Sequence, residues 1–390
     1  MSVEFLGMAA EYALVRDEVL ARTRTVLESQ AFVLGEQTRE LEASMTELTG
    51  VSQALACSSG SDALALALMA LGVGPGHAVI VPSFTFFATA GAVARVGALP
   101  VMADVDPLTC NMGAKELTET VEREFRREKG GRLLHRRNAA ELEAVIVVHL
   151  YGRATPMLEL GRLADDMGVP VIEDAAQAIG ARSDCGPVGS VGRIGCFSFY
   201  PTKNLGGAGD GGMLTTSDTA LARRLNRLRV HGAAPGDYRH EETGINGRMG
   251  ELQAAYLNAK LPHLRAWTEL RVSVANRYRQ GLEELEKAGL CFPPPPSDSG
   301  SHVYHQFVLR IPEQRDAVAE RLRADGVDCR IFYPMPLHLQ PCFASLGYEE
   351  GSLPAAERAS REVLALPMGV HMGGEQVEAV CASLRRAFDG

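Results

Sequence analysis

The chain has 390 residues and a formal net charge of −9 at pH 7, from 39 Lys and Arg against 48 Asp and Glu. Its 46% hydrophobic and 22% charged residues are typical of a soluble globular protein and exclude collagen, coiled coil and disorder as descriptions of the whole chain. An acidic chain of this size has no overall electrostatic attraction to nucleic acid or to anionic membranes, so neither is expected as a partner.

The N-terminus and the cysteines indicate a cytoplasmic protein. Residues 1–19 contain Glu4, Glu11 and Asp17 and no basic segment, so they do not predict a secretory signal. No run of about 18–20 apolar residues predicts a membrane span. The eight cysteines are scattered and none belongs to a Cys-x-x-Cys pair, which is typical of reduced thiols and predicts neither disulfides nor a metal site.

The first 200 residues alternate between helical and strand-like patterns. Apolar periodicity predicts helix over 12–48 with a break at Gly35, and a capped helix that begins at residues 58–62 and ends at Gly72. Strands are expected over 78–82, 99–104, 145–150, 169–174 and 195–199, and helices over 85–96 and 157–167. Short apolar strands that alternate with helices predict an α/β fold with a mostly parallel central sheet covered by helices.

The remainder of the chain predicts a second, smaller unit. A helix over about 249–290 is expected to bridge two lobes, and the prolines at 293–296 predict a stiff, exposed connector. A strand-like segment at 304–311 and helices at 315–325 and 374–388 follow. We therefore expect a large domain over 1–250, which includes the N-terminal helical segment, and a bridging helix with a smaller C-terminal α+β domain over 251–390.

A basic segment interrupts the α/β pattern at residues 122–137. It holds seven Lys or Arg and three Glu, a local net charge of +4. The pattern favours a solvated helix plus loop inserted before the next strand, and a docking patch for an anionic substrate or partner is the alternative.

The lysine that points most clearly to chemistry is Lys203. It follows the strand expected over 195–199 and precedes the glycine-rich stretch 206–212. A lysine in a tight, partly desolvated loop can have a lowered pKa and act as a nucleophilic amine. Glycines let the backbone approach a planar ligand closely. The alternative, a lysine exposed on the surface, stays open on this observation alone.

A carboxylate is expected at the ligand-binding edge of the sheet. Asp174 ends the apolar strand over 169–174, and ligands of parallel sheets bind at the carboxyl ends of the strands. A buried carboxylate there needs a cationic partner, and the protonated pyridine nitrogen of pyridoxal phosphate (PLP) is one such partner. Gln177 would lie over the same position. The alternative is an aspartate that caps the following helix.

Residues 59–62 stand at the N-terminus of a predicted helix. Free backbone N–H groups and the helix dipole make such an end an anion site that suits a phosphate, and Ser198 could add its hydroxyl to the same group. Helix N-termini of this kind also occur without a ligand. A phosphate cradle, an aspartate and a lysine in this order in an α/β chain together indicate a PLP enzyme.

The sequence resembles the DegT/DnrJ/StrS family of PLP-dependent sugar aminotransferases, a branch of the aspartate aminotransferase fold (fold type I). The resemblance runs nearly end to end and is carried by several motifs in the right order. These are residues 58–68, 82–89, 104–106, 149–152, 173–180, 197–206, 244–255, 333–338 and 366–368.

The resemblance implies the cofactor contacts. Lys203 would hold PLP through a Schiff base and shuttle the substrate proton, and Asp174 would pair with the pyridinium nitrogen. Gln177 would lie against one face of the ring or its hydroxyl, and Phe86 would stack on the other face. The phosphate would be held by the backbone amides of Ser61 and Asp62, the hydroxyl of Ser198 and, across a homodimer interface, Asn246 of the neighbouring subunit.

The resemblance also implies substrate contacts. Arg248 is a candidate for binding an anionic group of the amino donor or the sugar nucleotide, because a guanidinium suits carboxylate and phosphate alike. His305, Tyr333 and His338 resemble substrate-side residues of the smaller domain. A packed aromatic side chain or a surface histidine is the alternative at each of these three positions.

By this resemblance the expected reaction is a ping-pong transamination. L-Glutamate or L-glutamine would give its amino group to PLP, and pyridoxamine phosphate would pass it to a nucleotide-linked keto-sugar. The segments 203–206 and 209–212 look more like those of members that act on 3-keto-6-deoxy sugars. The alternatives are a 4-keto-sugar or cyclitol ketone aminotransferase and a PLP-binding sensor without turnover. A nicotinamide dehydrogenase would need a Gly-x-Gly-x-x-Gly stretch after the first strand, and here the glycine-rich stretch follows a lysine.

Overall fold

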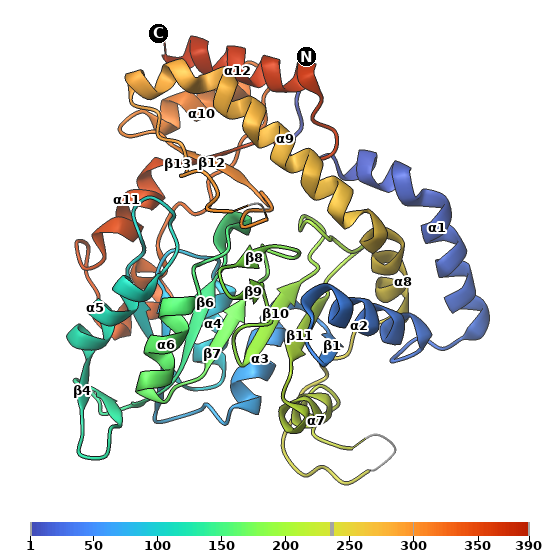
Figure 1. The fold of residues 1–390 in the computed structure, drawn as a ribbon, viewed down its shortest axis with the longest axis vertical. Helices are drawn as coiled ribbons and strands as arrows, with labels where there is room; N and C mark the ends of the chain where they lie inside the picture. The colour runs from blue at the N-terminus through green and yellow to red at the C-terminus, as the bar shows by residue number, and fades with distance from the viewer. Residues whose placement is uncertain (1, 235–237, 299, 389–390) are drawn as a thin grey trace.

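A central sheet organises the computed structural model, which describes residues 2–234, 238–298 and 300–388 (Figure 1). Within these residues, nine strands belong to the sheet, and seven follow the order β1-β11-β10-β7-β6-β2-β3. Their bounds are β1 Gln53–Cys57, β2 His77–Pro82, β3 Leu99–Ala103, β6 Glu141–Val148, β7 Val171–Asp174, β10 Ile194–Ser198 and β11 Gly212–Thr216. Strands β3, β2, β6, β7 and β10 pair in parallel, and β11 pairs antiparallel with β10 and β1. The expected mostly parallel sheet is confirmed.

Helices cover both faces of the sheet because the strands are apolar on both sides. Along β6, Ile146 packs into a core with one set of helices, and its neighbour Val145 packs into a different core on the opposite face. The first set is α3 Gly60–Ala70, α4 Ala88–Arg95 and α7 Thr219–Leu228. The second set is α5 Ala114–Glu124 and α6 Leu158–Met167, while α2 Glu36–Thr49 and α8 Glu251–Lys260 pack over the β1–β11 end.

A separate core, called here the terminal core, lies at the end of the molecule where both termini emerge (Figure 1). It is built around the antiparallel pair β12 Phe307–Arg310 and β13 Val363–Leu366, with α9 Leu264–Leu282, α10 Arg315–Ala324 and α12 Gly374–Phe388. Val3 joins this core through a parallel bridge to Val327, so the start of the chain packs against its C-terminal third. Helix α1 Met8–Ser29 lies against α8, and α11 Pro354–Glu362 precedes β13.

The expected helix over 249–290 is interrupted. Helix α8 ends at Lys260, a 3₁₀ turn spans Leu261–His263, and α9 follows and ends at Leu282. Pro262 lies in that turn and has no N–H to donate to the preceding turn of helix. In Figure 1, α9 rises from α8 beside the sheet to the terminal core, so α9 is the helix that joins the sheet region to that core.

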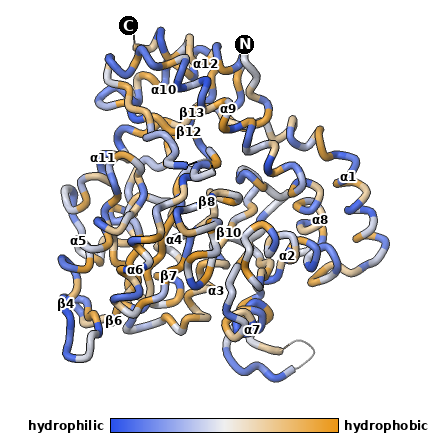
Figure 2. Tube along the Cα trace, in the orientation of Figure 1, coloured by the Kyte–Doolittle hydropathy of each residue, from blue (hydrophilic) through white to orange (hydrophobic). Residues whose placement is uncertain are grey.

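The expectation of a helix plus loop at 122–137 is wrong for most of that segment. Helix α5 ends at Glu124, and β4 Phe125–Arg127 and β5 Leu133–His135 form a hairpin. Phe125 and Leu133 bury their side chains in the core under α5 and α6, and the turn uses Gly130 and Gly131 with φ of 103° and 91°. The hairpin tip stands out as hydrophilic in Figure 2.

A small hairpin lies outside the central sheet. Strands β8 Arg182–Ser183 and β9 Gly186–Pro187 form a separate hairpin between β7 and β10. Across the described ranges, every helix is too short or too polar to cross a membrane.

Candidate active site

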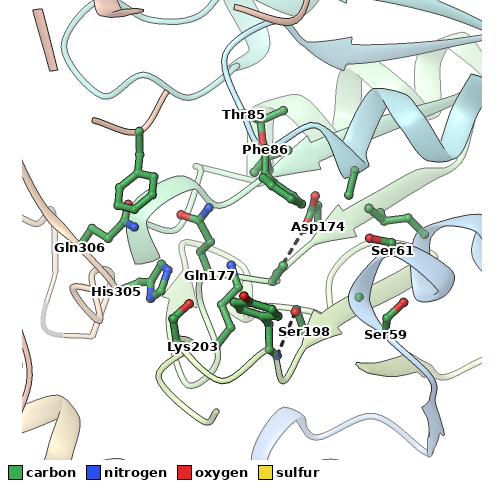
Figure 3. Close-up of a pocket in the computed structure, with 18 of the residues that line it drawn as sticks. Ser59, Ser61, Thr85, Phe86, Asp174, Gln177, Ser198, Lys203, His305 and Gln306 are labelled. Carbon is green, nitrogen blue, oxygen red and sulfur yellow. Dashed lines mark hydrogen bonds between the residues drawn. The ribbon is translucent and has the colours of Figure 1, made fainter. Parts of the chain in front are cut away.

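A cavity of about 420 Å³ opens at the carboxyl ends of β7 and β10 (Figure 3). Asp174 is the last residue of β7, Ser198 is the last residue of β10, and Lys203 follows five residues later. Ser61 comes from the first turn of α3, and His305 comes from the segment that leads into β12. The fold thus brings these residues to one place, at the edge of the sheet where parallel strands end.

Lys203 sits in a tight turn after β10. Its backbone N–H donates to the carbonyl of Tyr200 at 2.9 Å, and a Cβ on Gly206 would lie 2.0 Å from the carbonyl oxygen of Pro201. In the described part of the chain, the Lys203 amine has neither a hydrogen-bond partner nor an ion pair within 4 Å. Desolvation by the surrounding protein lowers the pKa of Lys203 to about 8, although the carboxylate of Asp174 acts in the opposite direction. The amine is therefore partly unprotonated near neutral pH and can act as a nucleophile.

Asp174 is a buried carboxylate aimed into the cavity. Its side chain accepts a hydrogen bond from the hydroxyl of Thr89 at 2.8 Å and another from the backbone N–H of Ala176 at 3.2 Å. Burial raises the pKa of Asp174, and the charge of Lys203 offsets part of that effect. Over the described ranges no Lys, Arg or His side chain lies within 4 Å of this carboxylate. A ligand that presents a positively charged N–H would therefore fit here, as a pyridinium ring does.

The first turn of α3 forms an anion site on the other side of the cavity. Ser59 caps the helix by accepting the N–H of Asp62 at 3.0 Å, and no acceptor for the N–H groups of Gly60 and Ser61 is found among the described residues. Ser198 accepts from the N–H of Tyr200 at 3.3 Å, so its own hydroxyl proton can be donated into the cavity. A Cβ on Gly60 would lie 2.6 Å from the Cβ of Ser198, and the glycine keeps this cradle open.

This arrangement differs from the expected phosphate contacts at Asp62. Its N–H is taken up by Ser59, and its carboxylate binds the hydroxyl of Ser58 at 2.6 Å and Arg95 at 2.5 Å, away from the cavity lining. The two amides with no protein acceptor belong to Gly60 and Ser61 instead.

Gln177, Tyr333 and Phe86 line the cavity together. The amide of Gln177 is fixed at both ends, since its oxygen accepts the N–H of Tyr151 at 2.7 Å and its nitrogen donates to the hydroxyl of Tyr333 at 3.0 Å. Burial raises the pKa of Tyr333, so this phenol stays protonated and can donate. Phe86 is 53% exposed at the cavity wall, with its ring centroid 6.1 Å from that of Tyr333. An exposed aromatic face at this position suits a stacked ring.

His305 is buried in the wall formed by the C-terminal part of the chain. Its Nδ1 lies 3.2 Å from the side-chain oxygen of Asn204, whose amide nitrogen donates to the carbonyl of Val303 at 3.1 Å. Burial and the nearby charges of Lys203 and Arg271 lower the pKa of His305 well below its usual value. The neutral ring therefore carries its proton on Nδ1 and offers the lone pair of Nε2 as an acceptor.

Besides Asp62, three expected site residues do not line this cavity. Asn246 is exposed and Arg248 is half-buried on the segment between α7 and α8. His338 is 1% exposed and lies between the hydroxyl of Ser83, 2.6 Å from its Nδ1, and the carboxylate of Glu357, 3.1 Å from its Nε2. His338 thus has the contacts of a packed core histidine.

Several cavity residues were not singled out from the sequence. They are Thr85, Tyr200, Thr202, Asp210, Gln306 and Phe332 in the wall, with Thr89 and Asn204 directly behind it. Thr85 lies in the bend before α4 and Thr89 in the first turn of that helix, and both belong to the segment 82–89, which is the signal that could have identified them. Gln306 and Phe332 carry no comparable signal.

Comparison with known proteins gives a consistent result over the full length. A profile of the DegT/DnrJ/EryC1/StrS aminotransferase family matches residues 14–385. The chain is 42% identical over 388 residues to a pleiotropic regulatory protein of Geobacillus stearothermophilus, covering 100% of this chain and 99% of that protein. It is 41% identical over 389 residues to UDP-N-acetyl-3-dehydro-alpha-D-glucosamine 3-aminotransferase of Acidithiobacillus ferrooxidans, with the same coverage.

A solved structure agrees with these sequence matches. DesV of Streptomyces venezuelae, in complex with a ketimine intermediate, superposes with a TM-score of 0.91 at 37% identity, over 100% of this chain and 99% of that one. The aminotransferase fold expected from the motifs is therefore confirmed. The arrangement of a lysine, an unpaired buried carboxylate and an anion cradle fits PLP, the cofactor of this family. The chain belongs to the DegT/DnrJ/EryC1/StrS family of PLP-dependent aminotransferases.

Proposed function

We propose that this enzyme transfers an amino group from L-glutamate or L-glutamine to a keto-sugar carried on a nucleotide, and that the keto group stands at C3 of a 6-deoxy sugar. The observation that carries the proposal is the Lys203 amine, with a pKa of about 8, in one cavity with the unpaired carboxylate of Asp174. The name of the Acidithiobacillus ferrooxidans relative, a 3-aminotransferase of a UDP-linked sugar, supports the nucleotide-sugar substrate and the C3 position.

The residues of the cavity can be given roles toward PLP. When bound, PLP supplies a carbonyl that accepts the amino group and a ring that stabilises negative charge on the substrate carbon. Lys203 would attach the cofactor, and Asp174 would hold a proton on the pyridine nitrogen. The amides of Gly60 and Ser61 and the hydroxyl of Ser198 would bind the phosphate. These three groups all have a hydrogen available for donation.

Lys203 would also move the proton of the reaction. Its Nζ would take a proton from the substrate carbon in one half-reaction and return one in the other. A pKa near the working pH suits a group that must both accept and donate. Gln177 and Phe86 would confine the ring from its two sides, because the amide of Gln177 is fixed at both ends and Phe86 presents an exposed face.

Substrate contacts are proposed for His305, Tyr333 and Arg248. The Nε2 of His305 can accept a hydrogen bond from a sugar hydroxyl, and the phenol of Tyr333 can donate one. Arg248 has the charge needed for a carboxylate or a phosphate. We assign His338 no substrate contact, because Ser83 and Glu357 occupy both of its ring nitrogens.

We further propose a homodimer with shared active sites. Asn246 and Arg248 do not line the cavity of their own chain, as expected of residues that serve the cavity of a second copy. Exposed aromatic rings stand beside the cavity at Phe86, Phe87 and Tyr200, which are 53%, 45% and 52% exposed. Large apolar side chains in such a position are typical of a surface that a second subunit covers.

The test is a visible spectrum of the purified protein before and after addition of L-glutamate, followed by keto-sugar nucleotides. A coloured band that bleaches with glutamate or glutamine and returns with a 3-keto-sugar nucleotide is the expected result. Return of the band only with a 4-keto-sugar or a cyclitol ketone would overturn the C3 assignment. The relative named as a regulatory protein favours one further candidate, a PLP-binding sensor. A band that no amino donor bleaches would support the sensor.

A further inference from the structure

We propose that Thr89 is a positioning residue that orients the Asp174 carboxylate and keeps it ionised for the cofactor ring, and that Thr85 in turn holds Thr89. The inference rests on the proposed role of Asp174 as the partner of the pyridine nitrogen. It concerns a residue outside the cavity lining, which acts on the cofactor through another side chain.

The contact between the two residues is buried and direct. Thr89 belongs to the first turn of α4 and is 0% exposed, while Asp174 ends β7 and is 6% exposed. The Thr89 hydroxyl lies 2.8 Å from Oδ2 of Asp174. The other oxygen, Oδ1, accepts from the N–H of Ala176. Each carboxylate oxygen thus has one protein donor and keeps a lone pair for a ligand.

The direction of the hydrogen bonds follows from the number of protons. An ionised carboxylate can only accept, so the single hydroxyl proton of Thr89 is donated to Asp174. The hydroxyl of Thr85 lies 3.3 Å from that of Thr89 and must therefore be the donor of that second bond. The result is an ordered sequence of donors, from Thr85 to Thr89 to Asp174, that begins at the cavity wall. Donors aimed at the charged form favour that form.

The helix backbone does not compete for the Thr89 hydroxyl as it does for a threonine deeper in a helix. A threonine within a helix often turns its hydroxyl back to the carbonyl four residues earlier. Thr120 does so in α5, where it donates to the carbonyl of Glu116 at 2.7 Å. Thr89 lies in the first turn of α4, which begins at Ala88, so no helical carbonyl stands four residues before it and its hydroxyl reaches the end of β7.

Loss of this hydroxyl has a defined electrostatic consequence. With Ala176 as the remaining donor, the carboxylate of Asp174 becomes a stronger base and takes up the proton that it would otherwise leave on the pyridine nitrogen. The bound ring then loses positive charge. A positive ring lowers the pKa of the nitrogen that joins the cofactor to Lys203, so this pKa rises when the ring becomes neutral.

The experiment compares Thr89→Val, Thr89→Ser and the control Thr120→Val in the holoenzyme. We measure the pH midpoint of the cofactor absorption and the dissociation constant of PLP from the apoenzyme. Thr89→Val should raise the midpoint and raise the PLP dissociation constant about tenfold to a hundredfold, as expected when a hydrogen bond to a charged group is lost. Thr89→Ser keeps a donor and should stay close to the wild type. Thr120→Val removes an equally buried hydroxyl elsewhere and should change neither quantity.

The inference is overturned if Thr89→Val leaves the pH midpoint of the cofactor absorption unchanged and the PLP dissociation constant within twofold of the wild type. If Thr89→Val does not fold, as judged by circular dichroism of the apoenzyme, the comparison of Thr89→Ala with Thr89→Ser replaces it. The Asp174→Asn variant distinguishes a failure of the role of Asp174 from a failure of the role of Thr89. If Asp174→Asn also leaves the spectrum unchanged, the proposed role of Asp174 fails; if only the Thr89 variants leave it unchanged, the role of Thr89 fails alone.

Discussion

Asn204 selects the tautomer of the neutral His305 ring, although the two residues are 101 positions apart in the chain. The Asn204 amide donates to the carbonyl of Val303, so its oxygen faces Nδ1 of His305 at 3.2 Å. Asn204, which directly follows Lys203 in the chain, thereby leaves Nε2 of His305 free to accept a hydrogen bond. The two walls of the cavity, one from the sheet and one from the C-terminal part of the chain, are joined at this contact.

This relationship predicts a defect confined to the second half-reaction. His305→Ala should slow amino transfer to the keto-sugar about tenfold, equivalent to about 1.4 kcal/mol, because one hydrogen bond to the substrate is lost. Bleaching of the cofactor band by the amino donor should remain near the wild-type rate and serves as the internal control. Equal slowing of both half-reactions would show that His305 supports the site in general and does not contact the sugar.

Lys203→Ala should abolish the visible band of the bound cofactor and lower the overall rate by at least about 10²-fold, the lower range of general acid–base catalysis. The measurement is a spectrum and a coupled assay of the same preparation. Lys129→Ala, at an exposed position of the β4–β5 hairpin, is the matched control for loss of one lysine and should leave both unchanged. Wild-type turnover of Lys203→Ala would exclude the assignment of Lys203.

The pKa of Lys203 predicts how PLP capture depends on pH. Only the unprotonated amine attacks a carbonyl, so the rate of PLP capture by the apoenzyme should rise with pH and level off above about 8. Asp174 raises the pKa of Lys203, and Asp174→Asn should therefore move this midpoint to lower pH. Stopped-flow absorbance across pH measures both. A midpoint near the ordinary lysine value of 10.5 would mean that the amine is not desolvated.

Gly60→Ala should weaken PLP binding, because the new Cβ would lie 2.6 Å from the Cβ of Ser198 and would push the two phosphate-binding elements apart. We expect at least about a tenfold rise in the PLP dissociation constant, equivalent to about 1.4 kcal/mol. Gly161→Ala in α6 is the control, since no atom lies within 4 Å of its added Cβ and alanine favours the helix. Unchanged affinity in Gly60→Ala would remove α3 from the proposed phosphate site.

A buried ion network should matter for stability. Glu11 binds Lys260 at 3.0 Å and Arg271 at 3.5 Å, and all three side chains are buried. Glu11→Ala leaves two cations without their carboxylate and should cost about 3–5 kcal/mol of unfolding free energy. Glu18→Ala, on the exposed face of the same helix, should cost less than about 1 kcal/mol. Denaturant unfolding of both variants measures the difference, and equal costs would contradict the prediction.

Part of the site could be recognised in the sequence because it depends on local chain order. Asp174 ends an apolar strand and Lys203 follows another, so chain order alone places both at a sheet edge, while Ser59 stands at a helix N-terminus. The seven basic residues of the segment 122–137 favour a solvated helix plus loop, whereas the structure has the β4–β5 hairpin there and buries Phe125 and Leu133. Pro262 was the missed signal for the break between α8 and α9.

The sequence by itself determined the alternation of strands and helices and the order of the reactive groups, since these follow from short-range patterning along the chain. Only the tertiary structure decided which hydroxyl holds Asp174, which nitrogen of His305 is free, and that His338 is occupied by Ser83 and Glu357. Such hydrogen bonds join residues from 19 to 255 positions apart. Their geometry depends on how packed elements meet in space, and no local pattern of residues encodes it.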